Sequence, residues 1–198
     1  MSNFSRKLNT IARNTDAYLK KIFLKQNSHS HLIKSMKYGS LNGGKRFRSA
    51  IVVNTGKIFG VDYKSLIVIG AVVECIHSYS LMHDDLPSMD NDDFRRGKPS
   101  AHKKFNEFTA ILAGNSLLTL AFEILSGNDL KVSKKIKTEL IRTLSNCSGH
   151  TGLAGGQYDD LTFENKKILE KSIINMQKKK TGKLFGFCCE SVAIIKGE

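Results

Sequence analysis

The chain has 198 residues, 40% of them hydrophobic and 25% charged, which is the composition of one folded domain with its own core. No apolar run approaches the length of a membrane span, the N-terminus has no apolar signal-peptide core, and the four cysteines lack CxxC spacing, so the sequence favours a cytoplasmic protein with reduced thiols. The formal net charge of +13 is compatible with nucleic acid, an anionic membrane surface or small phosphorylated substrates as partners.

All predicted elements are helices, because the only prolines are Pro87 and Pro99 and no segment alternates apolar and polar residues for long. The glycine-rich segment 148–161 is expected to be a loop. Residues 64–84 are apolar on nearly every side, so their helix should be central and buried. The sequence predicts an all-α bundle forming a single domain over 1–198, whose central helices deliver their ends to a shared cavity. In chain order, helices are expected over residues 3–27, from a glycine turn at 38–48 through residue 60, and over 64–84, 101–126, 130–148 and 165–195.

An acidic cluster follows the predicted central helix. A buried helix that ends in paired aspartates is costly unless a cation neutralises them, and oxygen-rich sites of this kind suit Mg²⁺. On an unbroken helix Asp84 and Asp90 would lie about 240° apart, but Pro87 loosens the chain and lets Asp90 swing back. We therefore predict a magnesium site in preference to a solvated acidic loop. The cluster consists of Asp84, Asp85, Asp90, Asp92 and Asp93.

Two arginines, Arg95 and Arg96, come directly after the aspartates. Planar guanidinium groups suit bidentate contacts with phosphate oxygens, so these side chains are candidates for holding phosphates that a metal bridges. The alternative is ion pairing with Asp92 and Asp93, which is more plausible for one arginine than for both.

Three further positions or segments carry weaker signals. The turn NGGKRFR places Lys45, Arg46 and Arg48 after two glycines at the start of a helix, where a backbone can approach an anion closely, although the spacing is not that of a P-loop. His77 lies about two turns before Asp84, a position usually filled by a core residue. The segment KKKTGK could reach phosphate through Lys180 and Thr181, or simply be a solvated helix end.

Taken together, these motifs resemble those of the trans-isoprenyl diphosphate synthases, the polyprenyl synthetase family. LMHDDLPSMDNDDFRRGKPSAH (81–102) is similar to the family's first aspartate-rich motif in its longer form, DDxxxxD. GGKRFR is similar to the isopentenyl diphosphate motif, ECIHSYS (74–80) to the helix leading to the metal site, and KTG (180–182) to the lysine and threonine of the allylic site. Four motifs in the family's order, spread over most of the chain, make a highly specific match.

The resemblance implies a terpenoid-synthase-type helical bundle around a central cavity, usually in a homodimer. It implies that Asp84 and Asp90 bind Mg²⁺ with support from Asp85, and that these residues and Lys180 form the catalytic group. The substrate-binding residues would be Arg95, Lys180 and Thr181 for the allylic diphosphate and Lys45, Arg48, His77 and Arg96 for isopentenyl diphosphate.

The reaction implied is the condensation of isopentenyl diphosphate with an allylic diphosphate, either dimethylallyl or geranyl, after Mg²⁺-assisted ionisation. Tyr79 and Ser80 lie roughly one helical turn before Asp84, so they should line the cavity beneath the first motif and set product length. An aromatic floor at Tyr79 favours a short product, and the surrounding sequence resembles bacterial farnesyl diphosphate synthases. Geranylgeranyl diphosphate is the alternative product.

One departure from the family pattern concerns its second aspartate-rich motif, which follows KTG in the family and has no counterpart here. The pair Asp159-Asp160 precedes KTG and is not expected to replace it. The chain therefore resembles the N-terminal portion of a synthase that lacks its C-terminal helices. Two other interpretations remain open. The chain could be a non-catalytic partner subunit derived from a synthase. It could also bind nucleic acid nonspecifically through its basic residues 1–48, but we expect this less because the sequence has no nucleic-acid-binding motif.

Overall fold

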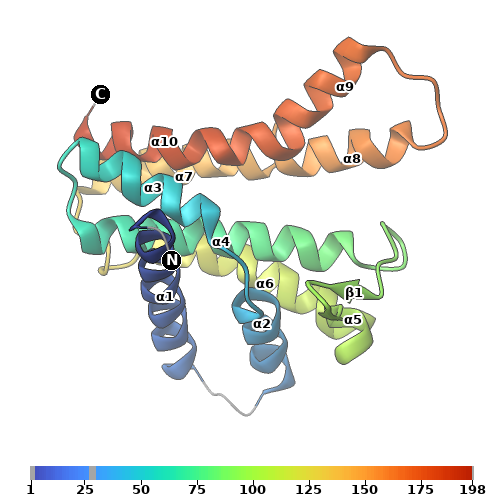
Figure 1. Cartoon of the computed structure of the whole chain (residues 1–198), viewed down its shortest axis with the longest axis horizontal. Helices are drawn as coiled ribbons and strands as arrows, with labels where there is room; N and C mark the ends of the chain where they lie inside the picture. Colours follow the sequence, from blue (N-terminus) through green and yellow to red (C-terminus); the bar gives the residue numbers. More distant parts are fainter. Residues whose placement is uncertain (1–2, 27–29, 198) are drawn as a thin grey trace.

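The computed structural model describes residues 3–26 and 30–197, and its architecture is all-α, as predicted (Figure 1). Two-residue strands, β1 (Phe94–Arg95) and β2 (Lys98–Pro99), pair antiparallel and are the only strands in those two ranges. The helices are α1 (Asn3–Leu24), α2 (His31–Leu41), α3 (Phe47–Ile58), α4 (Tyr63–Asp84), α5 (Ala101–Lys104), α6 (Glu107–Ser126), α7 (Lys134–Ser148), α8 (Leu153–Phe163), α9 (Glu170–Gln177), the π-helical turn η1 (Lys178–Gly182) and α10 (Lys183–Lys196).

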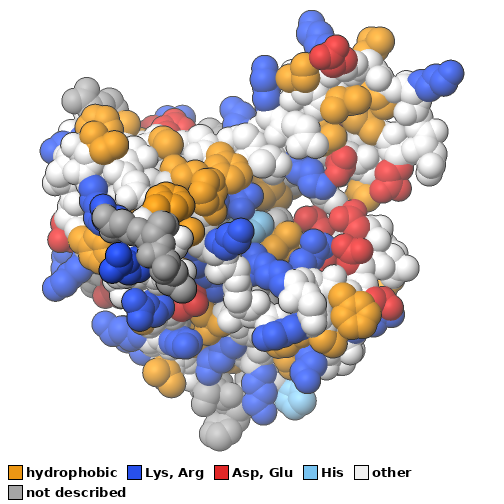
Figure 2. Space-filling view, viewed as in Figure 1, with side chains coloured by type: hydrophobic (Ala, Val, Ile, Leu, Met, Phe, Trp, Pro, Cys, Tyr) orange, Lys and Arg blue, Asp and Glu red, His pale blue; other side chains and the backbone are white. Residues whose placement is uncertain are grey.

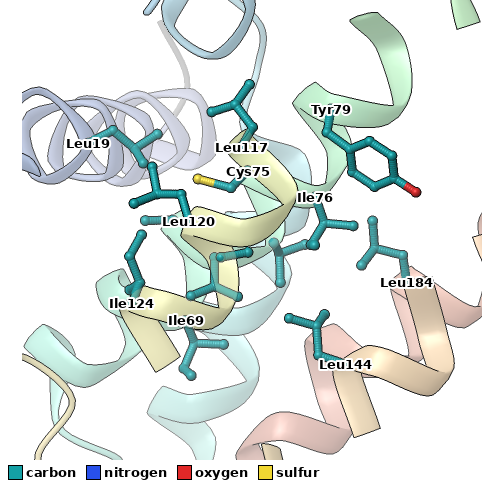
Figure 3. Close-up of a cluster of buried hydrophobic side chains, with 14 of the residues drawn as sticks. Leu19, Ile69, Cys75, Ile76, Tyr79, Leu117, Leu120, Ile124, Leu144 and Leu184 are labelled. Carbon is teal, nitrogen blue, oxygen red and sulfur yellow. The ribbon is translucent and has the colours of Figure 1, made fainter. Parts of the chain in front are cut away.

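Helix α4 is the central element of the bundle, in agreement with the apolar character of its sequence. Its N-terminus is capped by the Asp62 side chain, which accepts a hydrogen bond from the Ser65 backbone amide at 2.9 Å. Helices α1, α2, α3, α6 and α10 all pack against it. Figure 3 shows Leu120 of α6 beside Cys75 of α4. Ile76 of α4 lies on the side where Leu144 of α7 and Leu184 of α10 close the core. Burial on nearly every side fixes the position of the C-terminal end of α4.

Two helices, α4 and α6, are long and apolar enough to cross a membrane by length and composition, although the sequence was expected to contain no such stretch. Most of α4 is buried inside the protein, and half of the apolar window of α6 is buried as well. The core helix of a bundle has this composition because it is covered by other helices, and α4 fits that explanation.

The prediction of a loop over 148–161 holds only for the turn at 149–152 and is wrong for the rest, because residues 153–163 form α8. The glycines of this segment serve close packing. A Cβ atom at Gly156 would lie 2.1 Å from the Lys180 backbone nitrogen and 2.5 Å from its Cα, so only glycine lets α8 meet η1 this closely. Glycine content was therefore a misleading signal for a turn.

Other predicted helix boundaries also need correction. Predicted helix 101–126 is two helices, because Asn106 is extended and its side chain caps α6 by accepting from the Thr109 amide at 2.8 Å. Predicted helix 165–195 starts at Glu170 and contains the π-helical turn. Helix α2 was not predicted. Helix α1 ends at Leu24, before the predicted end of helix 3–27, and residue 27 itself lies outside the described residues.

Candidate active site

The C-terminal end of α4 presents the first two aspartates of the acidic cluster. Asp84 is the last residue of the helix and Asp85 is its C-cap. After Pro87 the chain turns back, and the Asp90 amide donates to the Asp84 carbonyl at 2.9 Å. The loosening at Pro87 thus returns Asp90 to Asp84, as the sequence indicated.

The electrostatics of Asp84 fit a site for a divalent cation. Burial raises the pKa of Asp84 to about 7, with Asp90 and Asp85 adding to the rise and Lys180 and Arg95 opposing it. Neighbouring carboxylates in a partly buried site disfavour each other's charge, and a bound cation removes that cost. Among the described residues no group of three or more His, Cys, Asp or Glu forms a complete metal site. Mg²⁺ sites commonly take only one or two carboxylates from the protein, and water and substrate phosphate complete the shell.

A tight hairpin carries the two arginines, which contact different partners. Arg96 and Gly97 form its two-residue turn with φ values of 55° and 73°, the left-handed pair that a type I′ turn requires. Arg95 donates from Nε to Asp85 at 2.8 Å, pairs with Asp85 again through Nη2, and contacts Asp92 at 2.9 Å. Ion pairing with Asp92, the alternative reading, thus holds for Arg95, and Asp85 is engaged by this arginine.

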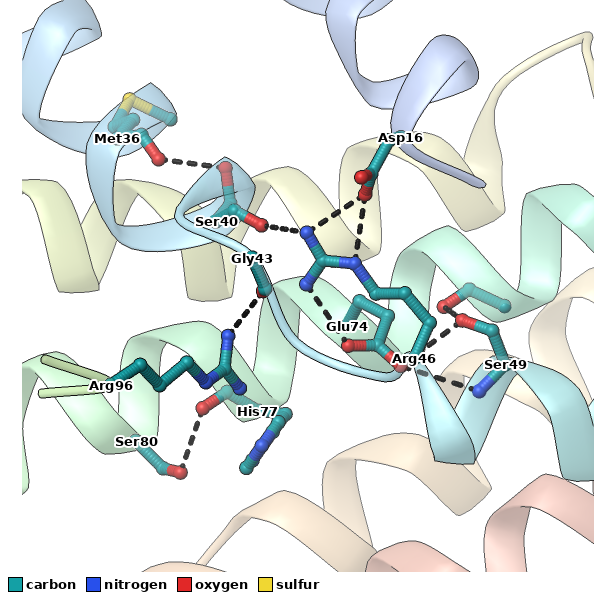
Figure 4. A network of polar contacts seen from close by, with 11 residues as sticks. Asp16, Met36, Ser40, Gly43, Arg46, Ser49, Glu74, His77, Ser80 and Arg96 are labelled. Carbon is teal, nitrogen blue, oxygen red and sulfur yellow. Dashed lines mark hydrogen bonds and ion pairs between the residues drawn. The ribbon is translucent and has the colours of Figure 1, made fainter. Parts of the chain in front are cut away.

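Arg96 has no such acidic partner in the described chain. Its Nη1 donates to the Gly43 carbonyl, and a Cβ at Gly44, where φ is 111°, would lie 2.6 Å from the same nitrogen. The glycine turn therefore folds closely around the Arg96 guanidinium. Figure 4 shows this contact with His77 close to Arg96.

The cations of the GGKRFR motif divide into a structural residue and two site candidates. Arg46 is buried and donates to Asp16 at 2.8 Å, to Glu74 at 3.3 Å and to the Ser40 carbonyl at 2.6 Å (Figure 4). It therefore joins α1, α2 and α4 and is not free to bind phosphate. Lys45 is exposed beside it. The Arg48 Nε atom is buried and has no hydrogen-bond partner within residues 3–26 and 30–197. An orphaned guanidinium donor of this kind suits an anionic ligand.

Sequence reasoning missed an aromatic partner of Arg48. The Phe185 ring of α10 lies 4.5 Å from the Arg48 guanidinium carbon, in cation–π contact. The proximity of these residues depends on how α10 packs against α3, so the local sequence pattern carried no signal for it.

His77 is held in the neutral state. Burial, and then the positive charges of Arg48 and Arg96, lower the pKa of His77 to about 3. At neutral pH its imidazole can donate one hydrogen bond to a phosphate without adding charge.

Replacing His77 with glutamine is expected to reduce the acid sensitivity of folding. His77 stays unprotonated in the folded state, but the unfolded chain takes up a proton at this position below about pH 6.5, so this group lowers stability as pH falls. Urea unfolding midpoints at pH 7.5 and 5 should therefore differ less for His77→Gln than for wild type. The exposed His150→Gln variant should retain the wild-type difference; if it changed as much as His77→Gln, His77 would not be the cause.

The KTG motif lies in the π-helical turn η1. Turns of this type are rare and are frequently found at functional sites. Lys180 is paired with Asp160 of α8, and Lys179 pairs with Asp159 at 2.8 Å. Thr181 follows and is half-buried. The pair Asp159-Asp160 is thus engaged by lysines, consistent with the expectation that it does not replace a second metal-binding motif.

A cavity of about 200 Å³ lies between the end of α4 and α8. It brings Tyr79, Ser80 and Asp84 of α4 together with α8 residues that include Leu153 and Gln157. The placement of Tyr79 and Ser80 beneath Asp84 agrees with the sequence prediction. Figure 2 shows a hollow beside the arm formed by α8 and α9, with acidic side chains gathered next to it.

Gln157 is a cavity residue that the sequence analysis did not identify. It is buried, and neither atom of its side-chain amide has a hydrogen-bond partner in the described part of the chain. A loop over 148–161 would not direct Gln157 toward α4, so no sequence pattern indicated that Gln157 lines the cavity with Tyr79 and Asp84.

Comparison with known proteins identifies the family. The polyprenyl synthetase family model matches residues 29–198. The chain belongs to the polyprenyl synthetase family. It is 45% identical to the farnesyl diphosphate synthase of Escherichia coli K12 over 168 residues, which cover 84% of this chain and 56% of that protein. The Haemophilus influenzae farnesyl diphosphate synthase is 40% identical over 196 residues, or 96% and 66% of the two chains.

Solved structures of this family share the fold. A geranyltransferase from Legionella pneumophila superposes with a TM-score of 0.93 at 35% identity, over 98% of this chain and 69% of its own. An FPP/GFPP synthase from Zymomonas mobilis gives 0.89 at 39% identity, over 98% and 72%. The chain spans a little over half the length of the first curated relatives that it matches.

Proposed function

We propose that the protein acts as a short-chain prenyltransferase, which condenses isopentenyl diphosphate with dimethylallyl or geranyl diphosphate to give farnesyl diphosphate. The observation that carries the proposal is that Asp84 lines a largely apolar cavity and lies within electrostatic reach of Asp90, Arg95 of the hairpin and Lys180 of η1. Carboxylates for a metal and cations for phosphate, placed above a hydrocarbon-sized space, match a metal–diphosphate group with a prenyl tail. We infer farnesyl diphosphate as the product because similar proteins are farnesyl diphosphate synthases.

Two groups of residues in this chain would bind the two diphosphate substrates. Arg95, Lys180 and Thr181 would hold the allylic diphosphate, and Lys45, Arg48, Arg96 and neutral His77 would hold isopentenyl diphosphate. Asp84 and Asp90, with support from Asp85, would hold Mg²⁺, which would supply Lewis-acid polarisation of the phosphate oxygens.

Bond cleavage leaves the electron pair on the departing diphosphate. Arg95 and Lys180 stabilise the negative charge that develops there. Apolar side chains such as Leu153 and Leu161 exclude water from the allylic cation. The double bond of isopentenyl diphosphate, held at near-attack distance, then adds to that cation, and the proton lost from the adduct passes to the released pyrophosphate.

The test of this function is Mg²⁺-dependent incorporation of labelled isopentenyl diphosphate into geranyl diphosphate. Replacing Asp84 with asparagine should lower the rate by about 10²-fold, because a metal-binding carboxylate at the ionising bond is lost. Asp93→Asn is the matched control: Asp93 is an exposed neighbour whose carboxylate pairs with Lys103 at 2.9 Å. Wild-type protein that binds both substrates without turnover would favour the non-catalytic partner subunit.

Replacing Tyr79 with alanine is expected to lengthen the product. Tyr79 is 8% exposed and its ring lines the cavity under Asp84, so its removal extends the space for the prenyl tail. The wild-type cavity of about 200 Å³ is only slightly larger than an engineered cavity of roughly 150 Å³ that holds benzene. It therefore suits a short prenyl chain. Chromatography of the products should show geranylgeranyl or longer chains for Tyr79→Ala. Tyr79→Phe keeps the ring and should keep the wild-type length; unchanged length in Tyr79→Ala would exclude this residue as the determinant.

We further propose that the protein is a cytoplasmic homodimer. One face of α6 supports self-association, since Phe108 is 66%, Ile111 40% and Leu112 50% exposed. Large apolar side chains gathered on one helix face are typical of a contact surface. Sedimentation analysis tests this by comparing wild type with a Leu112→Glu variant, which should dissociate.

A further inference from the structure

Two adjacent ion pairs join α8 to the π-helical turn η1. Asp159 contacts Lys179 at 2.8 Å, and Asp160 contacts Lys180. The backbones of the two elements also touch where Gly156 faces Lys180. Both pairs are Asp–Lys contacts between the same two elements, and they lie next to each other. Only the Asp160–Lys180 pair involves a residue that is proposed to bind substrate.

Lys180 pairs with a carboxylate at the edge of the cavity that Asp84 also lines. Asp160 belongs to α8, and its neighbour Leu161 lines the cavity together with Asp84 at the end of α4. The Lys180 charge is also the strongest of those that lower the pKa of Asp84. The ammonium thus lies within electrostatic reach of Asp84 while its direct contact is with Asp160.

We propose that Asp160 is a positioning residue that holds the Lys180 ammonium away from Asp84, so that the Asp84 oxygens stay available to a divalent cation. The inference rests on the magnesium role proposed above for Asp84. Without Asp160, the ammonium would be free to pair with Asp84, whose charge it already influences, and an ammonium paired there would occupy oxygens that the metal needs. Asp160 would also set where Lys180 meets a diphosphate, since a primary ammonium has three donors and can keep Asp160 while contacting phosphate.

The experiment titrates Mg²⁺ calorimetrically into the protein without any diphosphate, so that Lys180 has only protein carboxylates to pair with. Asp160→Asn is expected to weaken Mg²⁺ binding about fivefold, the effect of one partly exposed competing ion pair. Asp159→Asn removes the same charge one residue away and breaks the Asp159–Lys179 pair, but it leaves the Asp160–Lys180 pair intact. The Mg²⁺ affinity of this variant should therefore stay near that of wild type. Equal weakening in both variants would overturn the proposal, because general loss of negative charge would then explain the effect.

A second change separates positioning from simple structural damage. Lys180→Met removes the competing ammonium, so the double variant Asp160→Asn/Lys180→Met should recover the Mg²⁺ affinity lost in Asp160→Asn. Failure to recover would mean that Asp160 does not act through Lys180, and the proposal would be wrong.

A metal-free crystal structure of the Asp160→Asn variant tests the contact itself. The proposal expects Lys180 Nζ at hydrogen-bond distance from an Asp84 oxygen; an ammonium that stays in place or points to solvent contradicts it. This measurement is independent of the proposed function. If wild-type protein bound no Mg²⁺, the magnesium site would fail, and the position of Lys180 in the variant would still decide whether Asp160 holds it.

Discussion

The Gly156→Ala variant is expected to lose about 3 kcal/mol of stability or more and to melt roughly 10 °C lower than wild type. The added Cβ would lie 2.1 Å from the Lys180 nitrogen and 2.8 Å from the Lys179 carbonyl carbon, which are backbone atoms and cannot move aside as a flexible side chain can. Helix α8 must therefore shift from η1 as a unit. The same shift would displace Lys180 from its place beside Asp160, so pyrophosphate binding should weaken together with stability.

Gly186→Ala is the matched control, because Gly186 lies in α10 and a Cβ there would meet no atom of the described chain within 4 Å. Alanine in a helix interior is favoured over glycine by roughly 0.5–1 kcal/mol, so this variant should be slightly more stable than wild type. Thermal unfolding measures both changes. If the Gly156→Ala variant had the same melting temperature as wild type, α8 and η1 would not be packed as closely as described.

Sequence periodicity was sufficient to predict the bundle because its strongest signal came from its most buried helix. Residues 64–84 are apolar on nearly every side, and α4 lies in the centre with the predicted boundary at Asp84. The error at 148–161 has a physical origin. Glycine marks either a turn or a close helix contact, and Gly156 belongs to the second case because of η1, which lies more than twenty residues later in the chain. No local pattern distinguishes the two.

The site was predictable where a motif brings its own geometry. Pro87 indicated how Asp90 returns to Asp84, and the backbone hydrogen bond between them agrees. Roles that depend on packing were not predictable. Arg46 and Arg48 have the same side chain two positions apart, yet Arg46 is engaged by Asp16 and Glu74 whereas the Arg48 Nε atom lacks a partner among the described residues. Only the placement of α1 and α4 around the turn assigns one to the fold and the other to the site.

Replacing Arg46 with methionine is expected to destabilise the protein by about 3–5 kcal/mol, the cost of leaving a buried carboxylate without its cation. Glu74 is 3% exposed, so it cannot regain water when the guanidinium is lost. Among the described residues it would keep its contacts with Ser49, at 3.3 Å to the amide and 3.1 Å to the hydroxyl. Asp16 is more exposed and can be hydrated, so Glu74 should account for most of the loss.

The double variant Arg46→Met/Glu74→Gln separates this mechanism from a simple packing defect. Neutralising Glu74 removes the uncompensated charge, so the double variant should recover a large part of the stability lost in Arg46→Met, whereas a packing defect would remain. Lys45→Met makes the same kind of change at the exposed neighbour and should leave the unfolding free energy unchanged within about 0.5 kcal/mol. Urea unfolding of the four proteins measures these differences. If Arg46→Met were as stable as Lys45→Met, Arg46 would be available to bind phosphate, and its place in the network of Figure 4 would be wrong.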